Sequence, residues 1–366
     1  AGDSLKYARL YKHIRELMNL DMLQEKGLTG KGVRIAVFDA GFKGADVHPG
    51  FAHVHERKKV IAAKDFYGKK SDPYYHSVHG TAVLGCITGT YEGNWIGAAH
   101  DAEFLLARTE HNFFEKPKEE DHWMAAAEWA DRNGADLISS SLGYTKRKEY
   151  AELDGKTAVV TQAAAKAIRK GILVVNSAGN EGAGKWRYIV APADADSVLT
   201  VGGSYPQLRY RMPFSSFGPN ARHVLKPEVS APAAVVTTSD EGYSIFNGTS
   251  FACPLTSGFA ACLMQRNPEA TNMQIKSMMT EISHLSPFYD YGLGYGVPNA
   301  ATLFGVQNLP ERPTFQVRER NDSLFFVLDP AVVNRDTTTL KNGKPFHLQR
   351  HMPNGRLKNV QTFLIK

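Results

Sequence analysis

The sequence predicts an α/β fold: a doubly wound, mostly parallel sheet with flanking helices, followed by a small C-terminal all-β module. Three observations lead to this prediction. Short runs of apolar and β-branched residues alternate with segments of helical pattern. Glycines stand where several of those helical segments end. After about residue 304 only short strand patterns remain. Strands and helices in alternation are typical of parallel sheets covered by helices on both faces.

The elements follow in order along the chain. We expect buried strands at residues 33–38, 103–107, 136–140, 172–176 and 198–201. Helices are expected at residues 79–88, 122–133, 156–170, 250–266 and 272–282. In the C-terminal module we expect strands at 315–317, 323–328, 346–348 and 360–365, with turns at Asn342-Gly343 and Asn354-Gly355. The chain therefore divides into a charged helical lead-in (1–17), a main domain (18–305) and a small β-rich domain (306–366).

The charge and hydropathy of the chain exclude two broad classes of function. The formal net charge of the 366 residues is +6, but the basic residues are scattered and form no stripe interleaved with aromatic residues. We therefore expect no nucleic-acid partner. No uninterrupted apolar run approaches the roughly 18–20 residues of a membrane helix, so we expect no membrane span.

The chain has three cysteines, Cys86, Cys253 and Cys262. An odd number cannot pair completely within one chain, which excludes a disulfide scaffold. Each cysteine stands in an apolar, helix-like context, so we expect buried thiols that pack as small hydrophobic groups. A bridge between Cys86 and Cys253 remains an alternative.

Three polar residues stand where a parallel sheet places functional groups. Asp39 directly follows the first strand, His79 opens a helix, and Ser250 begins another helix after Gly248. A serine nucleophile needs a base within hydrogen-bonding reach, an acid behind that base, and donors for the oxyanion. Each residue also has an ordinary interpretation as a helix cap, a surface histidine or a turn residue. From the residues alone, the three form a plausible but open catalytic set.

The motifs around these residues resemble those of the subtilisin-like serine proteases. Val-Phe-Asp-Ala-Gly (37–41), His-Gly-Thr-Ala-Val-Leu-Gly (79–85) and Gly-Thr-Ser-Phe-Ala-Cys-Pro (248–254) are similar to the Asp, His and Ser motifs of that family, in the family's order. Further similar segments are Ser-Ser-Leu-Gly (140–143), Ser-Ala-Gly-Asn-Glu-Gly (177–182), Phe-Ser-Ser-Phe-Gly-Pro (214–219) and Lys-Pro-Glu-Val-Ser-Ala-Pro (226–232). The resemblance covers about residues 18 to 305.

The resemblance implies a serine endopeptidase that works through an acyl-enzyme intermediate. It implies that Ser250 attacks the scissile carbonyl, His79 takes its proton, Asp39 fixes the imidazole, and Asn180 assists the oxyanion hole. It also implies a substrate channel lined by Ser141, Leu142, Gly143, Ala178, Gly179, Glu181 and Val190.

Specificity follows less directly from the same resemblance. Val190 would lie near the floor of the primary pocket and favour mid-sized apolar side chains, whereas Glu181 at the rim could attract a basic one. Glu119, Glu120 and Asp121 precede a helix near the expected path of the upstream substrate residues. They either favour Lys or Arg upstream through charge complementarity or stabilise the first turn of that helix.

The resemblance further implies a secreted or cell-surface bacterial protein that acts as a monomer on protein or peptide substrates, with an inhibitory propeptide before maturation. Three positions depart from the usual motifs, namely Ala40, Ala82 and Cys253. Residues 88–97 lack the asparagine-rich calcium loop of several members, so we expect no cofactor and no metal there, although a structural calcium elsewhere stays possible.

Three rival functions can be weighed against this one. A catalytically silent, peptide-binding member of the same fold is the nearest alternative, although all four catalytic positions are filled. An esterase of another serine hydrolase class would need Gly-x-Ser-x-Gly and a different order of residues. A nucleotide-binding loop at Thr29-Gly30-Lys31-Gly32 lacks the required spacing.

Overall fold

The structure is a computed structural model that describes residues 2–68, 72–111, 115–207, 209–306, 315–320, 323–328, 344–351 and 357–365. The chain forms two compact units, Ala1–Leu303 and Phe304–Lys366. The domain boundaries expected from the sequence stay a prediction.

A seven-stranded sheet forms the centre of the first unit. Its strands are β1 (Arg34–Asp39), β2 (Val60–Asp65), β5 (Glu103–Arg108), β6 (Leu137–Ser140), β7 (Leu173–Ser177), β8 (Leu199–Ser204) and β9 (Val229–Pro232). They lie in the order β2-β5-β1-β6-β7-β8-β9, and all neighbours run parallel. The strand order reverses at β1, and ligands of such sheets bind at the carboxyl ends of the strands beside this point.

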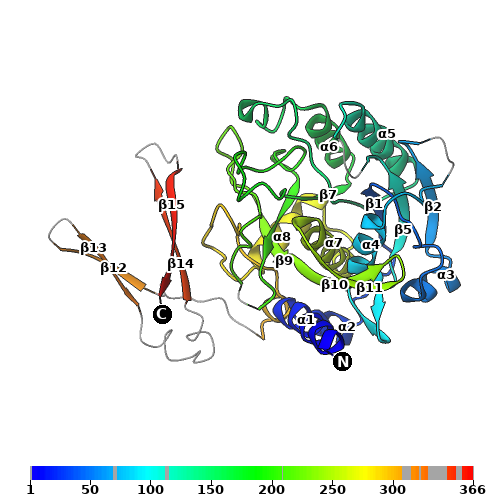
Figure 1. Ribbon diagram of the computed structural model, residues 1–366, viewed down its shortest axis with the longest axis horizontal. Coiled ribbons are helices and arrows are strands. Elements are labelled where there is room, and N and C mark those ends of the chain that lie inside the picture. Colours follow the sequence, from blue (N-terminus) through cyan, green and yellow to red (C-terminus); the bar gives the residue numbers. More distant parts are fainter. Residues whose placement is uncertain are drawn as a thin grey trace. The chain divides into compact units, whose positions relative to one another are not determined.

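Helices cover both faces of this sheet (Figure 1). On one face α5 (Lys118–Arg132) packs against α6 (Val159–Arg169), and on the other α4 (His79–Thr88) packs against α7 (Thr249–Arg266). Helix α8 (Asn272–Glu281) contacts α7. All residues of α7 from Phe251 to Leu263 are buried, which makes it the central helix of the domain. The predicted doubly wound α/β fold is therefore confirmed.

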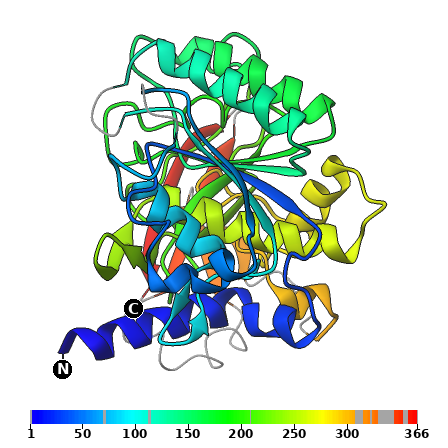
Figure 2. The same ribbon diagram turned by 90° about the vertical axis from the view of Figure 1, so that its right-hand side faces the viewer.

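Shorter elements complete the unit. They are α1 (Gly2–Met18), α2 (Leu20–Glu25), α3 (Ala52–Glu56), α9 (Ala300–Leu303), two 3₁₀ turns (Pro49–Phe51 and Tyr150–Glu152), and the hairpins β3 (Thr90–Tyr91) with β4 (Asn94–Trp95) and β10 (Ala234–Ser239) with β11 (Gly242–Asn247). Figure 2 shows α1 running along the bottom of the domain. Leu10, Ile14 and Leu17 of α1 are buried, and its Arg15 donates to the carbonyl oxygen of Ile96 at 3.4 Å. The helical lead-in thus packs onto the domain.

Several elements begin at other residues than the sequence indicates. Helix α4 has the predicted bounds, whereas α5 begins at Lys118 rather than at residue 122. Helix α6 begins only at Val159, because the backbone N–H groups of Lys156 and Thr157 bond to the Asp154 carboxylate in a preceding turn. Strands β2, β9, β10 and β11 were not predicted. Strand β2 is the half-exposed edge of the sheet and lacks a continuous apolar run.

The second unit contains two antiparallel pairs. Strand β12 (Phe315–Arg320) pairs with β13 (Ser323–Leu328), and β14 (Lys344–His351) pairs with β15 (Leu357–Ile365). Both predicted turns, Asn342-Gly343 and Asn354-Gly355, lie outside the described residues. The all-β module as a whole therefore stays a prediction.

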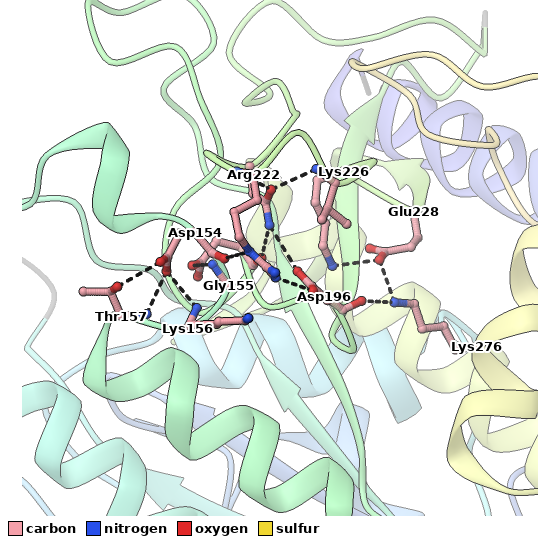
Figure 3. A network of polar contacts seen from close by, with 12 residues as sticks. Asp154, Gly155, Lys156, Thr157, Asp196, Arg222, Lys226, Glu228 and Lys276 are labelled. Atoms are coloured by element: carbon pink, nitrogen blue, oxygen red, sulfur yellow. Dashed lines mark hydrogen bonds and ion pairs between the residues drawn. The ribbon is translucent and has the colours of Figure 1, made fainter. Parts of the chain in front are cut away.

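A buried ionic network joins α8 to the residues directly before β8 and β9 (Figure 3). The Lys226 ammonium group is fully buried and bonds to Glu228 Oε1 at 2.7 Å and to the Val198 carbonyl oxygen at 2.8 Å. Lys276 of α8 bonds to the same Glu228 oxygen at 2.7 Å. Burial lowers the pKa of Lys226 to about 8 despite the charge of Glu228. Each buried charge thus has a partner, as a low-dielectric interior requires.

Candidate active site

Asp39 and His79 form a hydrogen-bonded pair at the carboxyl end of β1. The His79 Nδ1 atom lies 2.8 Å from Asp39 Oδ1 and 3.0 Å from Oδ2. The Asp39 side chain is completely buried, whereas 28% of the His79 side chain is exposed. Burial alone would lower the pKa of His79, but the charge of Asp39 and its hydrogen bond outweigh burial and raise that pKa above 6.5. The pair therefore presents an imidazole whose second nitrogen is directed away from the carboxylate.

Two glycines allow this pair to form. A Cβ on Gly80, the second residue of α4, would lie 2.4 Å from the Gly41 carbonyl oxygen and 3.0 Å from Asp39 Cβ. Gly41 has a φ of +142°, and a Cβ there would lie 2.5 Å from the Tyr75 carbonyl oxygen. Only glycine allows the start of α4 to approach the end of β1 this closely.

A buried ion pair that the sequence analysis missed supports the same strand end. Arg108 lies opposite Asp39 in the register of β5 and β1, and its Nε donates to the Ala40 carbonyl oxygen at 3.1 Å. Its Nη1 lies 3.1 Å from Asp65 Oδ2, and both side chains are almost fully buried. The signal in the sequence was Arg108 directly after a predicted apolar strand, whereas Asp65 ends β2, which has no continuous apolar run. The partnership itself joins residues 43 positions apart.

Ser250 lies in the first turn of α7, and its backbone is tied to the segment after β6. The Ser250 hydroxyl donates to the Ser141 carbonyl oxygen at 3.3 Å, and the Ser141 hydroxyl donates to the Ser250 carbonyl oxygen at 2.7 Å. In a regular helix that carbonyl would accept the N–H group of residue 254, but residue 254 is a proline and has none. The Phe251 ring lies 5.4 Å from the His79 ring, between centroids. Within the described part of the chain, no hydrogen bond joins Ser250 to His79.

Asn180 lies beside the start of α7. Its Oδ1 accepts hydrogen bonds from the Thr249 backbone N–H at 2.9 Å and from the Thr249 hydroxyl at 3.1 Å. These two donors fix the orientation of the amide, so its Nδ2 group is turned away from Thr249. A Cβ built on Gly248 would lie 3.7 Å from that Nδ2. The amide nitrogen is thus held near the residue that leads into Ser250, with the side chain open to solvent.

Val190 fills the space between the two segments expected to line the channel. A Cβ on Gly143 would lie 2.0 Å from Val190 Cγ2, and a Cβ on Gly179 would lie 2.7 Å from Val190 Cγ1. The Val190 N–H bonds to the Ala178 carbonyl oxygen at 3.2 Å. Leu142 is buried, and Glu181 is half-buried with its backbone N–H bonded to Ser216 Oγ at 3.0 Å. The structure therefore brings Gly143, Ala178 and Gly179 together around Val190, and the channel itself stays a prediction.

Comparisons with known proteins show the family of this chain. The model of the subtilase family matches residues 30–300. The chain belongs to the subtilase family. It is similar to a subtilisin of Bacillus pumilus, with 30% identity over 74% of this chain and 91% of that protein. It is also similar to subtilisin DY of Bacillus licheniformis, with 29% identity over 76% of this chain and 93% of that protein. The predicted family membership is confirmed, and this subtilase is a serine endopeptidase.

A solved structure shows the same fold. The subtilase superposes on MycP1 from Mycobacterium smegmatis with a TM-score of 0.63 and 23% identity, over 84% of this chain and 88% of the other. At this identity the likeness concerns the fold alone.

Two of the three acidic residues at the start of α5, Glu119 and Glu120, have partners within the fold of the subtilase. Glu119 is 1% exposed and accepts the backbone N–H groups of His111 and Lys116, both at 3.0 Å. Glu120 pairs with Lys148 at 2.6 Å. Neither of these two carboxylates is therefore free to select Lys or Arg upstream, and their partners lie outside the first turn of α5.

All three cysteines of the subtilase are buried free thiols, as expected, so the alternative bridge between Cys86 and Cys253 is not formed. The Cys253 sulfur instead lies 3.6 Å from the Ser140 carbonyl oxygen and 3.5 Å from that of Val175, against strands β6 and β7. Burial raises the pKa of the Cys253 thiol to about 11.

Residues 88–97 complete α4 and form the short hairpin of β3 and β4. In the described part of the subtilase, no group of three or more His, Cys, Asp or Glu residues could hold a metal ion. The expectation that no cofactor is needed stays a prediction. Among the described helices, none is long and apolar enough to cross a membrane.

Proposed function

We propose that Ser250 is the nucleophile of this endopeptidase, that His79 is its general base and that Asp39 orients the imidazole. The observation that carries the proposal is the Asp39–His79 pair, at 2.8 and 3.0 Å, which lies against Phe251, the residue next to Ser250. Without substrate, catalytic hydrogen bonds are often long or unformed. Rotation of the Ser250 hydroxyl away from Ser141 directs it to the imidazole. Attack on the scissile carbonyl gives an acyl-enzyme, which water then hydrolyses.

The oxyanion is stabilised by the Asn180 amide and by the backbone N–H of Ser250. The first N–H groups of a helix have no partner within the helix, and the positive end of the helix dipole lies there. Asn180 has its oxygen occupied by Thr249, which leaves its Nδ2 group as the donor. Donors that are held in position before substrate binds are the condition for strong electrostatic stabilisation, and the two hydrogen bonds from Thr249 to Asn180 Oδ1 support this role for the Asn180 amide.

Replacing Asn180 with alanine is expected to lower kcat about 10²–10³-fold with little change in KM. The donor acts mainly on the oxyanion of the transition state, and the magnitude is that known for the equivalent donor in subtilisin. Steady-state kinetics on a peptide ester and a peptide amide measure it. Asn133→Ala, at the far end of α5, is the control and should retain wild-type kinetics. An Asn180→Ala enzyme within threefold of wild type would contradict this role.

Val190 sets the depth of the primary pocket. Because it fills the space between Gly143 and Gly179, the pocket is shortened and favours mid-sized apolar side chains before the scissile bond. Val190→Gly is expected to shift the preference from Leu toward Phe by about tenfold in kcat/KM, since the lost side chain leaves room for a ring. A matched pair of peptides, Leu against Phe at that position, measures the shift. A wild-type enzyme that already prefers Phe would overturn the assignment.

The alternative of a silent peptide-binding protein predicts that Ser250 is unreactive. A fluorophosphonate probe, followed by mass spectrometry of the labelled peptide, separates the two functions. Labelling at Ser250 supports catalysis, and peptide binding without labelling supports the alternative.

We also propose, from the likeness to bacterial subtilisins, that the enzyme acts as a monomer outside the cell after removal of an inhibitory propeptide. Intact mass and cleavage assays on the exported protein test this part.

A further inference from the structure

A basic pocket lies at the start of α5, outside the residues assigned to the channel. Its volume is about 180 Å³, several times the roughly 30 Å³ that one water molecule occupies. It has room for a carboxylate side chain together with water. The lining residues come from the start of α5 and from the turn that follows the channel segment: Glu115, Lys116, Pro117, Glu120, Lys146, Arg147 and Lys148.

The charges around this pocket are unequal. Four cations line it, against two carboxylates. Glu120 is neutralised by Lys148 at 2.6 Å, and Glu115 accepts the Thr145 backbone N–H at 3.1 and 3.2 Å. Lys116 bonds to the Tyr67 hydroxyl at 3.0 Å, a partner without charge. Within the described residues, Lys146 and Arg147 form no ion pair, and both are exposed. The pocket therefore carries an excess of positive charge.

The pocket continues the line of the channel. The Ser141 carbonyl lies against the Ser250 hydroxyl, and the segment runs on through Gly143 to Tyr144, which pairs with Ala191 through two backbone hydrogen bonds of 2.9 and 3.2 Å. Thr145 then contacts Glu115 in the pocket wall. Lys146 and Arg147 follow Ser141 by five and six residues and form a turn, which the Lys148 N–H closes onto the Thr145 carbonyl oxygen at 3.1 Å. A substrate that pairs with this segment places its residue four or five before the scissile bond at the pocket.

We propose that this basic pocket selects an acidic side chain, Asp or Glu, four or five residues before the scissile bond, with Lys146 and Arg147 as the residues that recognise it. The inference rests on the proposed function, because it assumes that substrate lies along residues 141–145. It also replaces the expectation of upstream Lys or Arg. Glu119 is buried and Glu120 is paired with Lys148, so neither is available to attract a Lys or Arg side chain of the substrate. The cations, by contrast, line the pocket.

The test compares peptides that differ only at these two upstream positions. Octapeptides with Glu, Gln or Lys at the fourth and fifth residues before the cut are offered to the wild-type enzyme and to the double variant Lys146→Gln/Arg147→Gln. The wild-type enzyme is expected to cleave the Glu peptide with a kcat/KM about five- to tenfold above that of the Gln peptide, mostly through KM, and less so at about 0.5 M salt. The double variant should lose this preference, and Lys146→Glu/Arg147→Glu should prefer the Lys peptide.

The control removes two exposed cations elsewhere. Lys166 and Arg169 lie in the last turn of α6, just before β7 begins and thus at the amino ends of the strands. Lys166→Gln/Arg169→Gln should keep the preference for Glu, and thermal unfolding of all variants shows whether they are folded. A wild-type enzyme that cleaves all three peptides equally, or a double variant that keeps the Glu preference, overturns the pocket assignment and leaves the proposed function intact. No cleavage of any peptide by folded wild type would instead contradict the proposed function.

Discussion

Replacing Ser250 with alanine is expected to lower kcat about 10⁶-fold. The substitution removes the atom that forms the acyl-enzyme, and what remains is the modest acceleration from substrate binding and the oxyanion donors. The magnitude is the one established for subtilisin. The Ser250 hydroxyl makes one hydrogen bond, to the Ser141 carbonyl oxygen, so the melting temperature should change little. Cleavage of a fluorogenic peptide by a highly purified variant, over days if needed, measures the residual rate.

The matched control is Ser277→Ala on α8, an exposed serine whose hydroxyl bonds to Glu281 of the same helix. It should retain full activity and full labelling by a fluorophosphonate. The Ser250→Ala enzyme should show neither, although it should still bind substrate. Activity near the wild-type level in a folded Ser250→Ala variant would remove Ser250 from the mechanism.

Asp39→Asn is expected to lower kcat about 10⁴-fold at neutral pH. An asparagine at this position can donate its own N–H to Nδ1, which leaves the proton of neutral His79 on the nitrogen that must accept the Ser250 proton. Loss of the negative charge also removes what raises the pKa of His79, while burial still lowers it. The base must be neutral to act, so wild-type kcat/KM should fall as the pH drops through a pKa above 6.5. In the variant that midpoint should lie at lower pH.

A pH profile of kcat/KM measures both effects, and the NMR signals of the imidazole protons report the tautomer. Asp131→Asn on α5 serves as control, since its carboxylate is exposed and lies 3.9 Å from Lys170 in a surface ion pair. It should leave both the rate and the midpoint unchanged. A variant Asp39→Asn with an unshifted midpoint would mean that Asp39 does not set the charge state of His79.

The parts of the fold that follow from local sequence were predictable. Strands β1, β5, β6, β7 and β8 are largely buried, and each contains a short apolar or β-branched run. Strand β2 lies at the sheet edge and β11 is only half-buried, so neither gives such a run. The start of α5 was placed too late because Glu119 looks like a surface residue, although it is buried and accepts the backbone N–H groups of His111 and Lys116.

Candidate site residues that lie within local motifs could be predicted from the sequence. Contacts between segments far apart in the sequence could not. The local motifs indicate the residues of the proposed triad and Asn180, whose roles stay predictions. The Arg108–Asp65 pair joins two different strands, so the sequence near either residue does not predict it. The basic pocket was missed for the same reason. Lys146 and Arg147 read as scattered surface charge, and only the fold shows which neighbouring charges are neutralised and which are not.

Pro254 has no backbone N–H, so the Ser250 carbonyl oxygen has no hydrogen-bond donor within its own helix. An uninterrupted α-helix would satisfy the Ser250 carbonyl internally, and the nucleophile would then be positioned by its own helix alone. Here the vacancy left by the proline is filled by the Ser141 hydroxyl at 2.7 Å. The proposed nucleophile, Ser250, and the segment after β6 that begins with Ser141 are thus joined directly by hydrogen bonds. Any motion of α7 relative to the sheet is therefore expected to carry the Ser250 backbone and the Ser141 segment together.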